Sequence, residues 1–449
     1  MAEGGEKILE ARLHPSGFEM SDSNFYSLTC ASDSRLYYTL CSHDINTHAR
    51  VYRYDPQTDE VTLIADLGEV TGEAGKKSLP QGKSHTPFFE HDGKLYFASH
   101  YGYFKASGGK EEPAEVPEGY TQYPGGHFIE IEMRTGRARV LGTAQNAEGI
   151  ITMTLDGHRG RLYGLTWPRG YFIFLDLDTG RMTNLGPVSR DGEVGTGDRY
   201  FCLCRTFALF QETGDVYFTN PDGEILCYVY SRNRVERVDW AHMRKDVFGF
   251  WDPHTPGHQG YNWRPCKWHP GHQVFYGVHP KSGYLFLFDP KKKRHEMIDR
   301  ICSERIRKAG LFEYFRYGYL TLDFAPDDPE TVCYISGYYA YRDDVELTDE
   351  DRLHGLTCGS ADFSPGAFKK IRSFITFVTY HLPTRTYTDH GVVRLEDGRF
   401  PTNTQTIAVH PNGRVYTCPW LPRLHRQEGK PWSHCELISF RLPHTGGAL

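Results

Sequence analysis

This sequence of 449 residues lacks several features that would identify a functional class at once. It has no apolar run near the ~18 residues that a membrane-spanning helix needs. Its first residues, MAEGGEKILEARLHP, contain no apolar core of a secretory signal. It also has no G-x-S-x-G turn, Walker loop or C-x-x-C pair, so a serine hydrolase, a nucleoside triphosphatase and a zinc ribbon have no support.

Concentrated basic charge is absent as well. The formal net charge is −6, and Lys and Arg are scattered along the chain. The charge pattern therefore gives no electrostatic reason to expect a nucleic acid. We expect no nucleic-acid partner, no membrane partner and a monomeric protein.

Cysteine does not form a disulfide framework. There are 11 cysteines, an odd number, and Cys202 and Cys204 lie two residues apart in the strand-like run RYFCLCRTF. Such a pair is too constrained for an ordinary disulfide, and buried free thiols are common in reducing compartments. No Asn lies in an N-x-[ST] context. We expect a cytoplasmic protein, with a secreted protein whose signal has been removed as the alternative.

The residues that are abundant are aromatic, with 29 Tyr and 27 Phe, and these favour sheets over helices. A short unit recurs: an apolar strand, a Gly or Asp turn, a strand containing Leu-Tyr or Val-Tyr, and a strand ending near Asp-Pro or Asp-x-x-Thr-Gly. The clear copies contain SRLYYTL, GKLYFASH, GRLYGLTW, GDVYFTNP and QVFYGVHP, and the looser ones ETVCYISGYY and GRVYTCPW.

Seven such units, each with about four alternating strands, predict an all-β protein, a seven-bladed β-propeller of four-stranded antiparallel blades. The whole chain, 1–449, forms this single domain. The last unit lacks its final strand, and KILEARLH near the N-terminus is expected to supply it and close the ring. Helix is predicted only within 300–312 and 343–355.

In a propeller the first strand of each blade lines the channel, and it begins on the face where the second strand ends. Alignment of the units puts His85 and His100 at these two positions of one blade. Arg205, Arg264 and Gln405 begin first strands of other blades, and Trp167 ends a second strand. A channel wall needs polar residues to meet water, which explains any one of them. Together, cationic, imidazole and aromatic groups on one face suit an anionic sugar.

Two histidine-rich stretches resemble metal-ligand clusters. These are SHDINTH, with His43, Asp44 and His48, and HTPGHQGYNWRP, with His254 and His258. Turn and loop polarity explains both, so we predict no metal site.

The stretches SHDINTHARVYRYDP, KSHTPFFEHDGKLYFASHYGYF, GGHFIEIEMRTG and GRLYGLTWPRGYFIFLDLDTG together resemble the seven-bladed propeller polysaccharide lyases. These include ulvan lyases and L-rhamnose-α-1,4-D-glucuronate lyases, and propeller α-L-rhamnosidases are related to them. The resemblance covers most of the chain and is strongest over 35–230. It implies cleavage next to glucuronic acid by β-elimination in a uronate-containing oligo- or polysaccharide, at a terminal rhamnose linkage.

By position, the resemblance implies catalytic roles for His85 and His100, as proton-transfer and carboxylate-binding groups. Arg205, or Arg169 after Trp167, would neutralise the carboxylate, and Trp167 and Tyr101 would stack on sugars. Arg264 and Gln405 complete the predicted substrate contacts. No cofactor is required; some relatives hold a calcium ion in the channel, but no ligand set here demands one.

One residue departs from the family pattern. Ulvan lyases use a catalytic Tyr near the position of Thr152. Tyr101 or Tyr26 would replace it, a histidine would make both proton transfers, or the lyase site would be vestigial. Two other functions stay open: an α-L-rhamnosidase of the same fold, which is a hydrolase, and a propeller that only binds a sugar or a protein.

Overall fold

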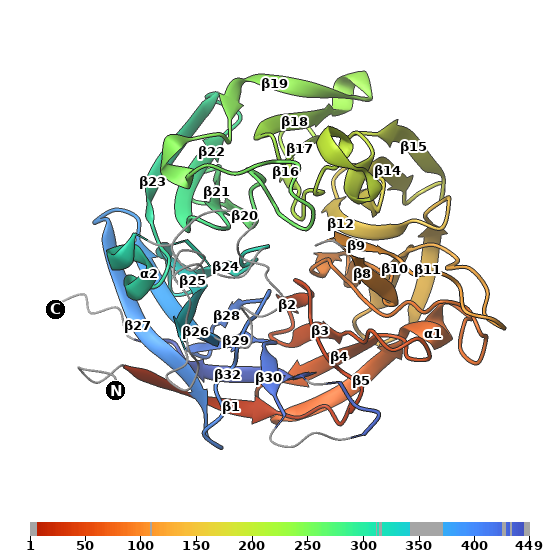
Figure 1. The fold of residues 1–449 in the computed structure, drawn as a ribbon, viewed down its shortest axis with the longest axis horizontal. Helices are drawn as coiled ribbons and strands as arrows, with labels where there is room; N and C mark the ends of the chain where they lie inside the picture. The colour runs from red at the N-terminus through yellow and green to blue at the C-terminus, as the bar shows by residue number, and fades with distance from the viewer. Residues whose placement is uncertain are drawn as a thin grey trace.

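The computed structural model describes residues 7–107, 110–310, 312–313, 317–341, 371–423, 428–431 and 433–443. Figure 1 shows four-stranded sheets arranged radially around a central axis, with one short strand of each sheet at the centre. The predicted all-β propeller is confirmed.

Five blades are separate antiparallel sheets, listed from the innermost strand outward. Blade 1 consists of β2 (Leu28–Cys30), β3 (Leu36–Leu40), β4 (Arg50–Asp55) and β5 (Glu60–Asp66). Blade 2 consists of β6 (Phe89–His91), β7 (Lys94–Ala98), β10 (His127–Glu132) and β11 (Ala138–Thr143), and blade 3 of β12 (Gly149–Asp156), β13 (Arg161–Trp167), β14 (Tyr171–Asp176) and β15 (Met182–Pro187). Blade 4 consists of β16 (Ala208–Phe210), β17 (Asp215–Thr219), β18 (Glu224–Val229) and β19 (Arg234–His242), and blade 5 of β20 (Cys266–His269), β21 (Val274–His279), β22 (Tyr284–Asp289) and β23 (Arg294–Arg300).

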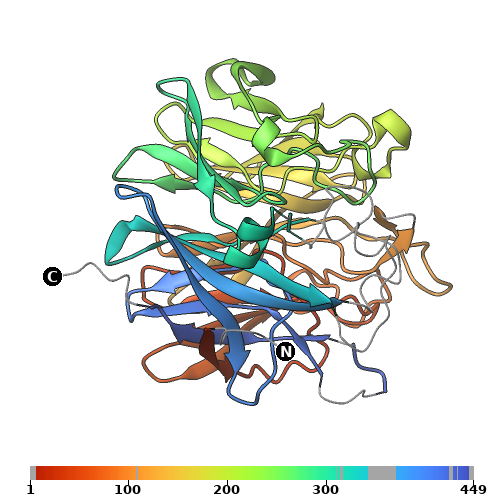
Figure 2. The same cartoon turned by 60° about the vertical axis from the view of Figure 1, so that its left-hand side comes forward.

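The last two blades share one eight-stranded sheet. Blade 6 holds β24 (Leu322–Ala325), β25 (Asp328–Tyr341), β26 (Ile371–His381) and β27 (Thr386–Leu395), and blade 7 holds β28 (Ala408–His410), β29 (Arg414–Thr417), β32 (Leu437–Arg441) and the N-terminal β1 (Ile8–His14). β1 pairs antiparallel with β32, which confirms the predicted closure. It also pairs in parallel with β27 of blade 6, which the sequence analysis did not predict (Figures 1 and 2).

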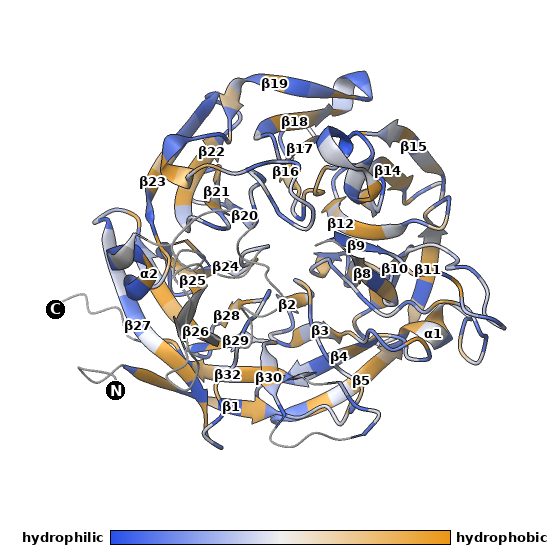
Figure 3. Ribbon diagram, in the orientation of Figure 1, coloured by the Kyte–Doolittle hydropathy of each residue, from blue (hydrophilic) through white to orange (hydrophobic). Residues whose placement is uncertain are grey.

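Apolar side chains fill the spaces between neighbouring blades. The middle strands are buried on both faces, as in β3, where every residue is buried, because each blade is packed between two others. Most residues of the outermost strands β5 and β19 are partly or fully exposed, since one edge faces solvent. Figure 3 shows this as orange central strands and a blue β19.

Helix is scarce, as predicted. The described α-helices are α1 (Leu67–Val70) and α2 (Glu304–Ala309), and α2 confirms the helix expected within 300–312. The one expected within 343–355 lies outside the described residues. Short 3-10 turns occur at η1 (Gly192–Val194), η2 (Gly197–Arg199), η3 (Tyr230–Arg232) and η4 (Asp246–Phe248). No helix among the described residues is long and apolar enough to cross a membrane.

Two short hairpins are added to the blades. They are β8 (Phe104–Ser107) with β9 (Lys110–Pro113), inserted in blade 2, and β30 (Trp420–Pro422) with β31 (Ser433–Cys435), in blade 7. All ten cysteines in the described part of the chain are free thiols, including Cys202 and Cys204.

The closing strand provides a test of the ring. Ala11 is fully buried and pairs with Leu395 on one side and Phe440 on the other. We expect Ala11→Arg to lower the free energy of unfolding by about 3 kcal/mol or more, because a charge enters the seam between two strands. The exposed neighbour Glu10, paired with Arg394, is the control: Glu10→Ala should change stability by less than about 1 kcal/mol. Urea unfolding measures both, and equal effects would contradict a closing role.

Candidate functional site

His85 and His100, the histidine pair, lie together on one face of the ring. Their ring centroids are 4.7 Å apart, edge to face. The backbone makes this contact: Lys83 and His100 exchange two hydrogen bonds, of 3.2 and 2.8 Å. The predicted meeting of the two histidines is confirmed. We call this face of the ring the site face.

Aromatic rings enclose the histidine pair. The Phe25 ring stacks on His85 at 4.5 Å and 3°, and the Trp167 ring meets His100 edge to face at 5.3 Å. The buried Lys83 ammonium lies over the Phe25 ring and, on the β8 hairpin, over the Phe104 ring. Lys83 was not predicted to belong to the site, because a lysine two residues before a histidine gives no sequence signal.

Neither imidazole of the pair makes a hydrogen bond with any described residue, and His85 Nε2 and His100 Nδ1 are buried without a partner. Burial holds both pKa values well below 6.5, and the nearby charges of Lys83 and Arg205 lower them further. Both rings are therefore neutral at pH 7 and can accept a proton. Buried unpaired nitrogens are uncommon and favour a role with a ligand.

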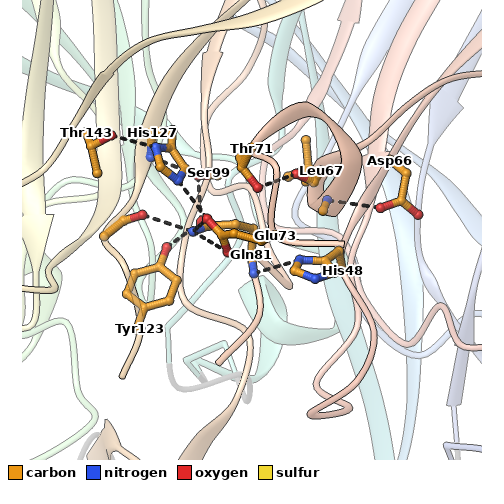
Figure 4. A network of polar contacts seen from close by, with 12 residues as sticks. His48, Asp66, Leu67, Thr71, Glu73, Gln81, Ser99, Tyr123, His127 and Thr143 are labelled. Atoms are coloured by element: carbon orange, nitrogen blue, oxygen red, sulfur yellow. Dashed lines mark hydrogen bonds and ion pairs between the residues drawn. The ribbon is translucent and has the colours of Figure 1, made fainter. Parts of the chain in front are cut away.

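A buried polar network holds the segments that carry the pair (Figure 4). The Gln81 side-chain oxygen accepts hydrogen bonds from Ser99 Oγ at 2.8 Å and the Tyr123 hydroxyl at 2.6 Å. The Gln81 amide donates to Glu73 at 3.1 Å, and Glu73 bonds His127 at 3.0 Å. These groups satisfy one another within the blade, so the backbone on either side of the histidine pair is fixed.

Arg205 and Trp167 share a buried carboxylate. Glu193 bonds Arg205 Nη2 at 2.7 Å and accepts from the Trp167 indole at 2.9 Å. Arg205 also donates to the Leu203 carbonyl at 2.7 Å. The predicted role of Arg205 as the group that neutralises a substrate carboxylate stays a prediction, and Glu193 already balances its charge.

Arg264 is placed differently. It is 4% exposed, and it donates from Nη2 to Gln405 Oε1 at 3.2 Å, while its Nε and Nη1 make no hydrogen bond with any residue that the structure describes. Asn403 Nδ2, also buried, is unpaired as well. Burial and the Arg205 charge lower the pKa of Arg264 to about 9, so it is a cation at pH 7, and no carboxylate of the described residues forms an ion pair with it. These free N–H groups form a ready anion-binding position.

The other residues predicted to contact a substrate already interact with protein groups. Tyr101 and Trp167 are buried and pack against each other at 5.6 Å. Their contact with a sugar therefore stays a prediction. Arg169 is 52% exposed and bonds the buried Glu148 at 3.2 Å. It lies one residue beyond Pro168, at the edge of blade 3.

Thr152 and Tyr26 are the positions relevant to the catalytic tyrosine of ulvan lyases, which this sequence lacks at the equivalent position. Thr152 is buried and donates to the Cys204 carbonyl at 2.6 Å, so it is used in the wall of the channel. Tyr26 has φ of 82°, a conformation rare outside glycine, and burial raises the pKa of its hydroxyl. It lies at the boundary between the site face and the channel below.

The channel on the other side of Tyr26 is mainly apolar. It holds a cavity of about 640 Å³ lined from the inner strands of all the blades, with Trp268 and Phe324 among its walls. Its charged residues, Lys267 and Asp323, are paired with each other. The unpaired polar groups described above are on the site face, which is therefore the functional candidate.

The two histidines of the stretch SHDINTH do not come together as one ligand group in the described structure. His43 bonds Asp22, and His48 Nδ1 accepts from the Gln81 backbone, so the two histidines have separate partners. Among the described residues, one ligand group gathers elsewhere, His269, His272 and Glu330. Both nitrogens of His269 already have backbone partners.

Comparisons with known proteins show the fold. No family model and no curated protein sequence matches the chain. A catalytically inactive histidine-to-alanine variant of virginiamycin B lyase from Staphylococcus aureus, with quinupristin, matches at TM-score 0.50 and 9% identity, over 96% of this chain and 97% of that one. A chain of the mitotic checkpoint complex matches at TM-score 0.50 and 9% identity, over 99% and 98%.

The extracellular domain of BT4673 from B. thetaiotaomicron matches at TM-score 0.48 and 9% identity over 96% of this chain. The chain spans 40% of the length of that protein. These likenesses are to propeller-like folds and do not show a polysaccharide lyase or rhamnosidase family.

Two glycines at opposite ends of β12 offer a matched test of the site. A Cβ on Gly149 would overlap His100 Nδ1, and a Cβ on Gly157 would overlap His91 Nδ1 on the opposite face. We expect Gly149→Ala to displace the His100 ring and to shift the NMR signals of the histidine pair. Gly157→Ala should leave those signals unchanged while costing similar stability. Unshifted signals in Gly149→Ala would show that the ring is not held as described.

The neutral state of His100 predicts a pH dependence of stability. Its folded pKa is below 6.5, so the unfolded chain binds the proton first as pH falls, and stability is lost below pH 6.5. We expect His100→Gln to remove up to about 1.4 kcal/mol of this loss per pH unit. Urea unfolding of both proteins between about pH 7.5 and 4.5 measures it. Parallel curves would mean that the pKa of His100 is the same in the folded protein as in the unfolded chain.

Proposed function

We propose that the protein is a lyase that cleaves uronate-containing oligo- or polysaccharides by β-elimination, at a terminal rhamnose-α-1,4-glucuronate linkage. The observation that carries the proposal is a set of buried polar groups that no described residue satisfies: His85 and His100, whose rings are in contact, and the Arg264 guanidinium, whose Nε and Nη1 make no hydrogen bond. A carboxylate would pair with that guanidinium while an imidazole removes the adjacent proton.

The chemistry requires this combination. The proton at C5 of a uronate is weakly acidic, so its removal needs a cation or hydrogen-bond donors at the carboxylate to hold the developing charge. Arg264 Nε and Nη1, with Asn403 Nδ2 nearby on blade 7, supply donors that no described residue uses. The electron pair then forms the C4–C5 double bond, and the C4–O4 bond breaks.

His85 fits the role of base better than His100. The carboxylate carbon is bonded to C5, so the base must lie near the group that holds the carboxylate. The charge of Arg264 is one of those that lower the pKa of His85. His100 then supports His85 through their edge-to-face contact.

The related fold neighbours are compatible with the proposal and add no substrate. One is named a lyase, virginiamycin B lyase, and its likeness at 9% identity extends to the fold alone. The uronate and rhamnose part of the proposal rests on the sequence stretches that resemble the propeller lyases and on the charge of the site.

The direct test is incubation with gum arabic oligosaccharides that end in rhamnose-α-1,4-glucuronate. Elimination gives an unsaturated uronate with an ultraviolet band, and its mass is lower by one water than the hydrolysis product. Free rhamnose without the unsaturated product would replace the lyase with the α-L-rhamnosidase. Binding with neither product would leave a propeller that binds a sugar.

Replacement of Arg264 by a neutral residue should slow turnover strongly. We expect Arg264→Gln to lower kcat/KM by about 100-fold or more, because the carboxylate loses its charged partner in a buried site. His85→Gln should lower kcat by about 10²- to 10⁴-fold. Arg237, exposed on β19 and paired with Glu224, is the control: Arg237→Gln should keep full activity. If Arg264→Gln were as active as the native protein, Arg264 would not bind the substrate carboxylate.

A further inference from the structure

His43 is a third histidine on the site face, and its environment differs from that of the pair. Its Nδ1 bonds Asp22 Oδ1 at 2.8 Å, and its backbone N–H donates to Asp22 Oδ2 at 2.9 Å. One carboxylate therefore fixes both the backbone and the ring. Because Nδ1 is used, Nε2 is the nitrogen that remains for a ligand, and no described residue bonds it.

His43 is accessible and lies beside the histidine pair. Its side chain is 32% exposed, whereas the pair is buried. Its ring meets Phe25, the ring that stacks on His85, at 5.8 Å, and it meets Phe104 at 5.1 Å. His43 and His85 therefore both contact the Phe25 ring.

Asp22 gives His43 a carboxylate partner, which the histidine pair lacks among the described residues. Burial raises the pKa of the Asp22 carboxyl, and the hydrogen bonds and charge of His43 outweigh it and hold the pKa below its ordinary value. Asp22 is therefore an anion, and it accepts a hydrogen bond at the Nδ1 side of the His43 ring. His85 and His100 have no carboxylate partner among the described residues, and cations surround them.

We propose that His43, oriented by Asp22, is the general acid that protonates the leaving oxygen. This inference rests on the proposed lyase function and supplies its missing proton donor. His85 takes the C5 proton, and the C5–H electron pair becomes the C4–C5 double bond. The C4–O4 pair leaves with O4, which takes the proton from His43 Nε2. The two histidines then return to their starting states by exchanging one proton with water.

Other candidate donors fit less well. The Lys83 ammonium is buried and lies over the rings of Phe25 and Phe104, which cover it. Tyr101 packs in the apolar core against Tyr123. His43 alone among these joins an oriented ring, an exposed nitrogen and a compensating carboxylate.

Two substrates with different leaving groups test the role. From the rhamnosyl glucuronide, rhamnose leaves through its anomeric oxygen, which needs a proton. A 4-deoxy-4-fluoroglucuronide instead loses fluoride, whose conjugate acid is much stronger than a sugar hydroxyl. We expect His43→Gln to slow elimination of the rhamnosyl substrate by about 100-fold or more. It should slow loss of fluoride by only a few-fold. Ultraviolet absorbance measures the first, and a fluoride electrode the second.

The comparison variants separate the possible failures. His85→Gln should slow both substrates, since it removes the base. His381, the last residue of β26, is the matched control, with the same 32% exposure and an Asp near its ring, and His381→Gln should change neither rate. Asp22→Asn should resemble His43→Gln in its dependence on the leaving group.

Two results would overturn the acid role while the lyase stands. These are a His43→Gln enzyme with unchanged rates, and one that loses both substrates equally with an unchanged unfolding transition. If the native protein eliminates neither substrate, the lyase proposal itself fails and the acid role with it.

Discussion

The pairing of β1 with β32 is the constraint on which the rest of the molecule depends. It joins the two ends of the chain, and it requires each blade to pack against two neighbours. The groups of the site come from positions as distant as Asp22, His100 and Gln405, and no local segment contains them. They meet because a closed ring turns the beginnings of its inner strands toward one axis.

Within that ring, the site face is costly to fold. Two buried imidazoles lack hydrogen bonds, and the Arg264 guanidinium has nitrogens without partners. Each arrangement lowers stability, because polar groups leave water and receive nothing in return. By contrast, the polar groups of the Gln81 network and the Glu193 carboxylate have hydrogen-bond or ion-pair partners, and they hold neighbouring groups in place. An anionic ligand would supply hydrogen-bond partners to these unpaired groups, which the hydrogen-bonded residues around them hold in place.

The three histidines show how one residue type is adapted to different tasks. His85 and His100 are buried beside cations and stay neutral, and His43 is exposed and paired with a carboxylate. An elimination needs both kinds, one ring to accept a proton and one to donate it. The proximity of all three to Phe25 or to one another places these opposite environments within one site.

The sequence alone determined the fold class, the closing N-terminal strand and the meeting of His85 with His100. Repeated strand and turn patterns report local structure, and equivalent positions of similar blades must lie on the same face. The sequence could not distinguish Arg205 from Arg264, because the difference lies in Glu193, which precedes Arg205 by a long loop and neutralises only that arginine. Nor could it separate His43 from a turn histidine, since its partner Asp22 lies on a different segment. Tertiary structure decided these points, because the charge and accessibility of a side chain depend on which distant residues pack against it.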